Sequence, residues 1–167
     1  MQKLKKGWQE FEETAQIFEN FLTEFNYNQS LKTKIKKARF AHTDKEIKNF
    51  NFYPDKKGKT IEKVKLFSFF SQNDDYLNII KPASKIIEAG YRPGDIFELC
   101  DIAISNPWLQ LYYPIVALNS MWQCGNFINF PALDSCTHST KRQLTVFRFW
   151  TEGNMIWPKC CHFLGVR

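Results

Sequence analysis

The segment Lys141–Arg167, KRQLTVFRFWTEGNMIWPKCCHFLGVR, is the stretch that decides the fold. Apolar and polar residues alternate in its first part, so that Leu144 and Val146 lie on one face of a predicted strand. A turn-like Thr151–Asn154 follows, and Cys161–Val166 is predicted to be the last strand. We expect this apolar strand to lie within a sheet.

Composition favours a small globular protein. The chain has 167 residues, of which 44% are apolar and 16 are Phe, which suits one domain or a compact domain with a helical extension. The net charge of +6 favours ordinary solubility over nucleic-acid binding. No run reaches the ~18 apolar residues of a membrane span, and MQKLKKGWQEFEE lacks the apolar core of a signal peptide. We expect a cytoplasmic protein, or one assembled into a virion or surface structure.

The cysteines do not form a metal or disulfide pattern. Their number is odd, no CxxC occurs, and His138 and His162 are not at a zinc spacing. Free thiols are favoured over a disulfide and over a metal site. The five are Cys100, Cys124, Cys136, Cys160 and Cys161.

Residues 1–60 are predicted to be a helical region and a linker, separate from a domain over residues 61–167. Apolar residues from Trp8 to Phe25 recur every three or four positions, which predicts an amphipathic helix. Ser30 is a predicted N-cap of a second helix. Its Leu31, Ile35 and Ala38 are expected inside, with Lys32, Lys34, Lys36, Lys37 and Arg39 outside. A solvated face is favoured over a phosphate-binding one.

The rest of the chain predicts an α+β fold with its helices grouped on one side. A strand begins near Ile61, and a helix over 82–89 has Gly90 beyond its end. A second helix begins near Pro93 and stops at Asn106-Pro107. Short strands follow at 115–118 and at 127–130, the latter ending at Pro131, before a polar loop over 134–140.

No catalytic pattern is present in the sequence. GxSxG, GxxxxGK[ST] and GxGxxG are absent. Asp95, Glu98 and Asp101 share one face of a predicted helix, where a solvated face at the positive end of the helix is favoured over a metal site. We expect no catalytic residue, no metal and no cofactor.

The face opposite Leu144 mixes aromatic and small polar residues, and two interpretations stay open for it. Thr145, Phe147 and Phe149, with the residues up to Ile156, would form an exposed binding patch similar in composition to a paratope. Alternatively, the sheet is buried on both faces and covered by the N-terminal helices.

Five motifs resemble the variable proteins of diversity-generating retroelements. They are GYRPGDIFELCDIA, YYPIVALNSMW, FPAL, RQLTVFRFW and Trp157 followed after five residues by FLGVR, and they cover about residues 76–167. His162 departs from the usual Arg and Gly165 from the usual Ala. Residues 1–60 match nothing in this family.

The resemblance implies a C-type-lectin-like fold, shared with formylglycine-generating enzymes. In that fold the first strand pairs with the last, two helices pack behind them, and the final strands and loops display a ligand-binding surface. Reverse transcription mutates template adenines, mostly in Asn codons, and the product replaces the 3′ end of the gene. Such mutation cannot produce Trp, Glu, Lys, Gln or Met, because the third base stays a pyrimidine.

This rule sorts the C-terminal segment, whose variable region is about 134–162. Fixed residues are Trp150, Glu152, Met155, Trp157 and Lys159. The apolar scaffold is Leu144, Val146, Phe163, Leu164 and Val166, with Cys161 in a scaffold position. The candidates for variation and ligand binding are Ser135, Cys136, His138, Thr145, Phe147, Phe149, Thr151, Gly153, Asn154, Ile156, Pro158 and Cys160.

Three classes of function follow. The leading hypothesis is a non-enzymatic, diversified display protein that binds protein ligands. An enzyme of the formylglycine-generating type would need a reactive cysteine pair, for which Cys160-Cys161 is poorly placed. A small basic protein could bind nucleic acid through Lys32–Arg39. The calcium and sugar motifs EPN, QPD and WND are absent, so we expect no calcium-dependent sugar binding.

Overall fold

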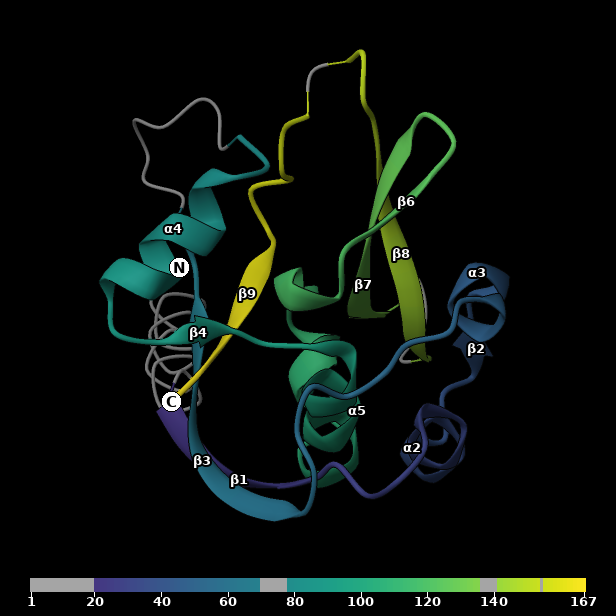
Figure 1. The fold of residues 1–167 in the computed structure, drawn as a ribbon, viewed down its shortest axis with the longest axis vertical. Helices are drawn as coiled ribbons and strands as arrows, with labels where there is room; N and C mark the ends of the chain where they lie inside the picture. The colour runs from purple at the N-terminus through teal and green to yellow at the C-terminus, as the bar shows by residue number, and fades with distance from the viewer. Residues whose placement is uncertain (1–19, 70–77, 136–140, 154) are drawn as a thin grey trace, which may run out of the picture.

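The fold is mixed α+β and is built around one large sheet (Figure 1). The computed structural model describes residues 20–69, 78–135, 141–153 and 155–167. Within them the strands are β1 (Asn20–Asn26), β2 (His42–Thr43), β3 (Lys59–Phe67), β4 (Arg92–Pro93), β5 (Ile115–Val116), β6 (Trp122–Cys124), β7 (Phe127–Ser135), β8 (Arg142–Trp150) and β9 (His162–Val166). The helices are α2 (Leu31–Ala38), α3 (Lys45–Asn49), α4 (Lys81–Glu88) and α5 (Ile96–Ser105), with short 3-10 turns η1 (Leu109–Leu111) and η2 (Leu118–Ser120).

The C-terminal strand β9 lies inside the sheet, as predicted. The strand order is β1-β3-β9-β5-β7-β8-β2, with β4 beside β9 and β6 beside β7. β9 pairs antiparallel with β3, where Val166 faces Val64, and parallel with β5. The pairing of β3 with β9 agrees with the expected pairing of the first and last strands.

Two apolar clusters cover the two faces of the sheet. One contains Leu164 and Val166 of β9 together with most of the buried residues of α5. The other contains Phe163 of β9, Ile86 of α4 and Trp157. Because successive side chains of a strand point to opposite faces, β9 is buried on both.

Residues 20–26 form a strand, so the prediction that the first helix reaches Phe25 is wrong there. Thr23 and Phe25 are buried, whereas Leu22 and Glu24 are exposed. This is a period of two, and β3 supplies the antiparallel partner. The spacing of Leu22 and Phe25 also suits a helix, and only the distant partner decides between them. The earlier part of that predicted helix lies outside the described residues.

The second predicted helix is confirmed as α2, but one of its lysines is not solvated. The Ser30 side chain caps the helix by accepting from the Thr33 N–H. Lys34 is fully buried, because α2 packs against α5. Residues 42–58 contain β2 and α3 and then lead into β3, so the sheet and its core cross the predicted boundary at residue 60.

The two helices of the central region are confirmed, whereas the expected end of a strand at Pro131 is wrong. Gly90 follows α4 with a φ of 79°, and α5 begins with a capping box of Asp95 and Glu98. β7 continues through Pro131 to Ser135. The Pro131 carbonyl accepts from the Ala117 N–H, so its nitrogen faces the same side and removes no hydrogen bond from the pairing with β8.

Candidate functional site

The predicted variable residues lie on β8 and on the loop that follows it. Thr145, Phe147 and Phe149 are in β8, and Ser135 ends the neighbouring β7. Thr151, Gly153, Ile156, Pro158 and Cys160 lie between β8 and β9. Cys136, His138 and Asn154 fall outside the described residues. The loop rises above the sheet at one end of the molecule (Figure 1).

The aromatic residues of β8 face a core rather than solvent. Phe149 is 9% exposed and Phe147 is half-buried. The ring of Trp157 lies 4.7 Å from that of Phe149 and 5.9 Å from that of Phe147. The expectation that Phe149 is exposed is therefore wrong, because Trp157 folds back over the strand. The alternative interpretation is correct that this face of β8 is covered, but the described cover is the Trp157 loop and not the N-terminal helices.

Trp157 fixes the position of the loop. It is 1% exposed, and its ring lies 5.0 Å from that of Phe130 and 5.1 Å from that of Phe163. Its indole N–H donates to the Ile79 carbonyl at 3.3 Å. Aromatic pairs at these separations stabilise a core beyond the area that they bury. One fully buried side chain thus anchors a loop that also contains exposed positions.

Three candidate positions of the loop are exposed. They are Gly153, Pro158 and Cys160. A Cβ added at Gly153 would meet nothing nearer than the Trp150 carbonyl at 3.5 Å, which is ordinary contact. Thr151 and Ile156 are half-buried, and the Thr151 hydroxyl donates to the Asn126 carbonyl at 3.1 Å. Substitution at the three exposed positions leaves the core intact.

The other face of β8 carries residues that the sequence did not place in a site. Trp150 is 51% exposed. The guanidinium of Arg148 pairs with the Glu46 carboxylate and lies 5.6 Å from the Phe127 ring. Since α3 was not predicted, its approach to β8 had no signal in the sequence.

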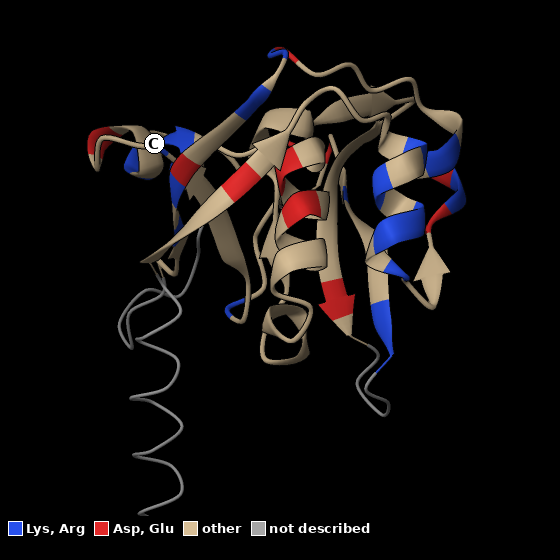
Figure 2. Cartoon of the chain, turned by 90° about the horizontal axis from the view of Figure 1, so that it is seen from below, with Lys and Arg blue, Asp and Glu red and all other residues tan. Residues whose placement is uncertain are grey.

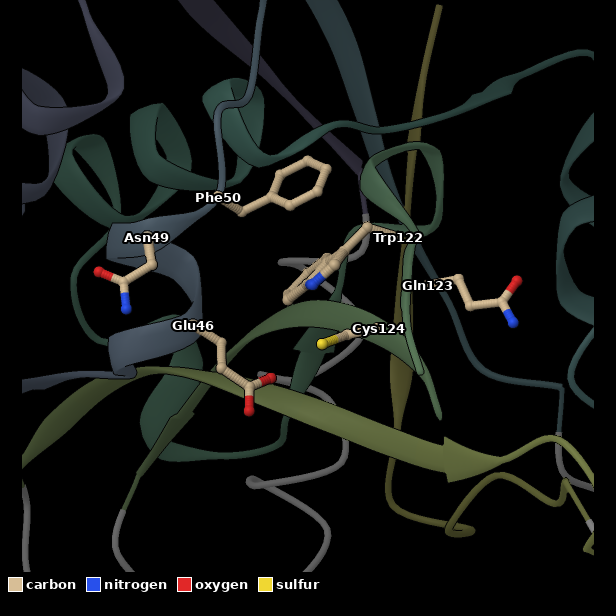
Figure 3. A pocket seen from close by; sticks show the side chains of 6 residues that line it. All are labelled: Glu46, Asn49, Phe50, Trp122, Gln123 and Cys124. Carbon is tan, nitrogen blue, oxygen red and sulfur yellow. The ribbon is translucent and has the colours of Figure 1, made fainter. Parts of the chain in front are cut away.

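A pocket of about 300 Å³ lies between α3 and β6, beside this face. It is lined by Glu46, Asn49, Phe50, Trp122, Gln123 and Cys124. The Trp122 indole lies between Phe50 and Cys124, while Gln123 points away (Figure 3). The rings of Phe50 and Trp122 are 5.4 Å apart, so one wall of the pocket is aromatic.

The predicted solvated face of Asp95, Glu98 and Asp101 is buried, which corrects that prediction. Asp101 pairs with Lys34 and accepts from the Asn26 N–H at 2.9 Å. Burial raises the pKa of Asp101, and it also raises the pKa of Asp95 to about 6, with the charge of Glu98 adding to the effect. Asp101 therefore binds α5 to the N-terminal part of the chain, whereas Asp95 caps α5 itself.

Glu98 is the centre of the same buried network. Arg92 donates to its Oε2 at 2.9 Å and also pairs with Glu62 at 2.6 Å. The Tyr27 hydroxyl donates to Glu98, and burial together with that bond raises the pKa of Tyr27. Each of these groups is satisfied by a protein partner, as buried polar groups generally are. The network is therefore structural.

Four cysteines lie in the described part of the chain, and all are free thiols: Cys100, Cys124, Cys160 and Cys161. Burial raises the pKa of Cys100 and of Cys161. No three described His, Cys, Asp or Glu residues are placed to hold a metal ion. The described helices include none long and apolar enough to cross a membrane.

Comparison with protein-family models, curated proteins and solved structures finds no match to this chain.

Proposed function

We propose that this chain is a non-enzymatic display protein that binds protein ligands through a C-terminal surface diversified by a retroelement. The observation that carries the proposal is the division between buried and exposed residues along the last strand and its preceding loop. Trp157, Cys161, Phe163, Leu164 and Val166 are each at most 1% exposed. They are the fixed or scaffold positions that the resemblance implies.

Three exposed positions of the same loop, Gly153, Pro158 and Cys160, carry residues that mutation of Asn codons can produce, whereas the exposed Glu152 and Lys159 are fixed by the same rule. Gly153, Pro158 and Cys160 have no part in either core cluster. A protein tolerates exchange at such positions because its stability resides mainly in the buried set. A surface that changes over a constant core supports recognition of many ligands with one fold.

A C-type-lectin-like arrangement is part of the proposal. It is supported by the antiparallel pairing of β3 with β9. The helices depart from the expected grouping on one side, because α4 and α5 pack on opposite faces of the sheet. In this arrangement Phe149 supports the loop from below and the exposed loop positions contact the ligand.

The non-enzymatic part of the proposal rests on the chemistry of the thiols. Thiolate is the reactive form of cysteine, and burial raises the pKa of Cys161. Of the two adjacent cysteines, Cys160 therefore has an exposed thiol, and Cys161 has a buried, protonated one.

The DNA beside the gene tests the origin of the surface. We expect a near-copy of the 3′ end of the coding sequence that differs from it mainly where the copy has adenine, together with a reverse-transcriptase gene. Flanking DNA with neither feature would overturn the diversification proposal.

Two substitutions test whether Phe149 supports the fold while Cys160 belongs to the exposed surface. Phe149→Ser should lower the free energy of unfolding by about 3–5 kcal/mol, because it opens a cavity beside Trp157. Cys160→Ser should change it by less than about 0.5 kcal/mol. Urea denaturation followed by tryptophan fluorescence measures both, and equal losses would contradict the assignment.

A further inference from the structure

A second pocket lies between α2 and the segment that follows α3, on the side of the molecule formed by these two helices. Its volume is about 400 Å³. Its apolar lining comes from the aliphatic Leu31, Ile35 and Ile47 and from the aromatic Phe50 and Phe52. An apolar lining suits a branched or aromatic side chain, because burial of apolar area is favourable wherever it displaces water.

The rim of this pocket is basic. Lys32 of α2 and Lys48 of α3 line it, and both are exposed. No described acidic residue forms a salt bridge with either lysine. The acidic residues of the α3 segment are engaged elsewhere, since Asp44 caps the helix and Glu46 pairs with Arg148.

Lys and Arg positions are concentrated along the ribbon on this side of the protein (Figure 2). α2 has no acidic residue in its first turn and carries Lys36 and Lys37 in its last turn. A basic surface around an apolar pocket steers and holds a partner of opposite charge. We propose that the α2–α3 pocket docks an acidic segment of a partner protein, with one apolar side chain of that segment filling the pocket.

The chemistry favours a peptide over a nucleic acid. Single-stranded nucleic acids stack their bases on aromatic faces along a basic track. Here no continuous basic track exists on α2, because Lys34, in the middle of the basic run, is buried against Asp101, and three of the five apolar lining residues are aliphatic. The site does not depend on the proposed function, because α2 and α3 lie apart from the loop at residues 151–160 (Figure 1).

The test uses the full chain and a short fluorescein-labelled peptide of Glu residues around a central Leu-Phe pair. We expect fluorescence anisotropy to give a dissociation constant of about 10–100 µM at low salt, as for a small groove site. A peptide with Ser-Ser in place of Leu-Phe should bind at least about tenfold more weakly.

Two double variants separate the pocket from general charge. Lys32→Glu/Lys48→Glu should weaken binding by roughly tenfold or more. Lys37→Glu/Lys63→Glu changes the net charge equally at two exposed positions outside the pocket and should weaken binding only slightly. Equal weakening by the two variants would overturn the proposal.

Two further outcomes decide between partners. Tighter binding of an oligo-dT of matched charge would overturn the proposal in favour of nucleic acid. NMR shift mapping on the unmodified protein should place the peptide at residues 31–35 and 47–52, and shifts confined to other regions would also overturn it.

Discussion

Lys34 is a buried lysine on a helix whose other lysines are exposed. Lysine on a basic helix is expected in solvent, yet this side chain is fully buried beside Asp101. The two residues are 67 positions apart, so no local pattern links them. The pairing becomes visible only once α2 is packed on α5.

Removing one partner of this pair should be costly. We expect Lys34→Met to lower the free energy of unfolding by about 3–5 kcal/mol, because Asp101 would keep a buried charge without a cation. Lys36→Met, on the exposed face of the same helix, should change it by about 0.5 kcal/mol or less. Urea denaturation at pH 7 compares the two, and a small loss for Lys34→Met would refute this assignment.

Asp95 should make stability depend on pH. Burial and the charge of Glu98 raise its pKa to about 6, from an ordinary value near 4. The folded protein therefore binds this proton more tightly than the unfolded chain does. Its contribution to stability is present below about pH 4 and is lost as the pH rises to about 6.

Asp95→Asn removes the charge and keeps a good N-cap. We expect the variant to lose less stability than the parent between about pH 4 and 6, and to be more stable at pH 7 by on the order of 2 kcal/mol. Denaturation midpoints across this pH range measure the effect, with the exposed Asp55→Asn as the control. Parallel pH profiles for Asp95→Asn and the parent would contradict the expectation.

Gly165 of β9 lies close to the side chain of Phe67, which belongs to β3. A Cβ at this position would lie 2.5 Å from Cε2 of Phe67 and 3.3 Å from Cγ2 of Ile86. The chain thus has Gly where the resemblance leads one to expect Ala, because Phe67 occupies the space.

Gly165→Ala should lower the free energy of unfolding by about 1–3 kcal/mol through overpacking. Adding Phe67→Leu to Gly165→Ala should recover most of this loss, because the smaller side chain makes room for the Cβ. Phe67→Leu alone should destabilise the protein, because it leaves a void. A double-mutant cycle measured by thermal unfolding gives the coupling between the two positions. Simple additivity of the two changes would show that the ring does not set the requirement for glycine.

Among the elements, the sequence correctly predicted those helices whose ends are set by local residues. α2, α4 and α5 have a capping side chain, a proline near the start or a glycine beyond the end. β1 was missed because its pairing with β3 overrides an ambiguous spacing. Phe149 was misplaced because Trp157, in the loop that follows β8, folds back over it.

The whole molecule joins both predicted parts through one core. Phe25, Ala38 and Ile47 precede residue 60 and lie in the same apolar cluster as Leu164. A fragment of residues 61–167 would lose these contacts and the cation beside Asp101. We expect it to show collapsed amide dispersion in ¹H–¹⁵N spectra under conditions in which the full chain is well dispersed. A dispersed spectrum for the fragment would contradict this expectation.

The surroundings of the candidate site were predictable in part at this scale. Gly153 lies in the turn that the sequence predicted after β8, and Gly153, Pro158 and Cys160 are exposed. The pockets around Phe50 were not predictable, since they form where α2, α3 and β6 meet. Sites built from one segment can be read from the chain, whereas sites between segments require the fold.

The position of β9 has a consequence for synthesis. It separates β3 from β5 in the sheet, although both precede it in the chain. While the ribosome is still making residues 117–161, β3 and β5 therefore have unpaired edges facing a gap that only β9 can fill. Nascent chains of this protein should depend on chaperones that shield strand edges until β9 emerges and the sheet closes in a single late step.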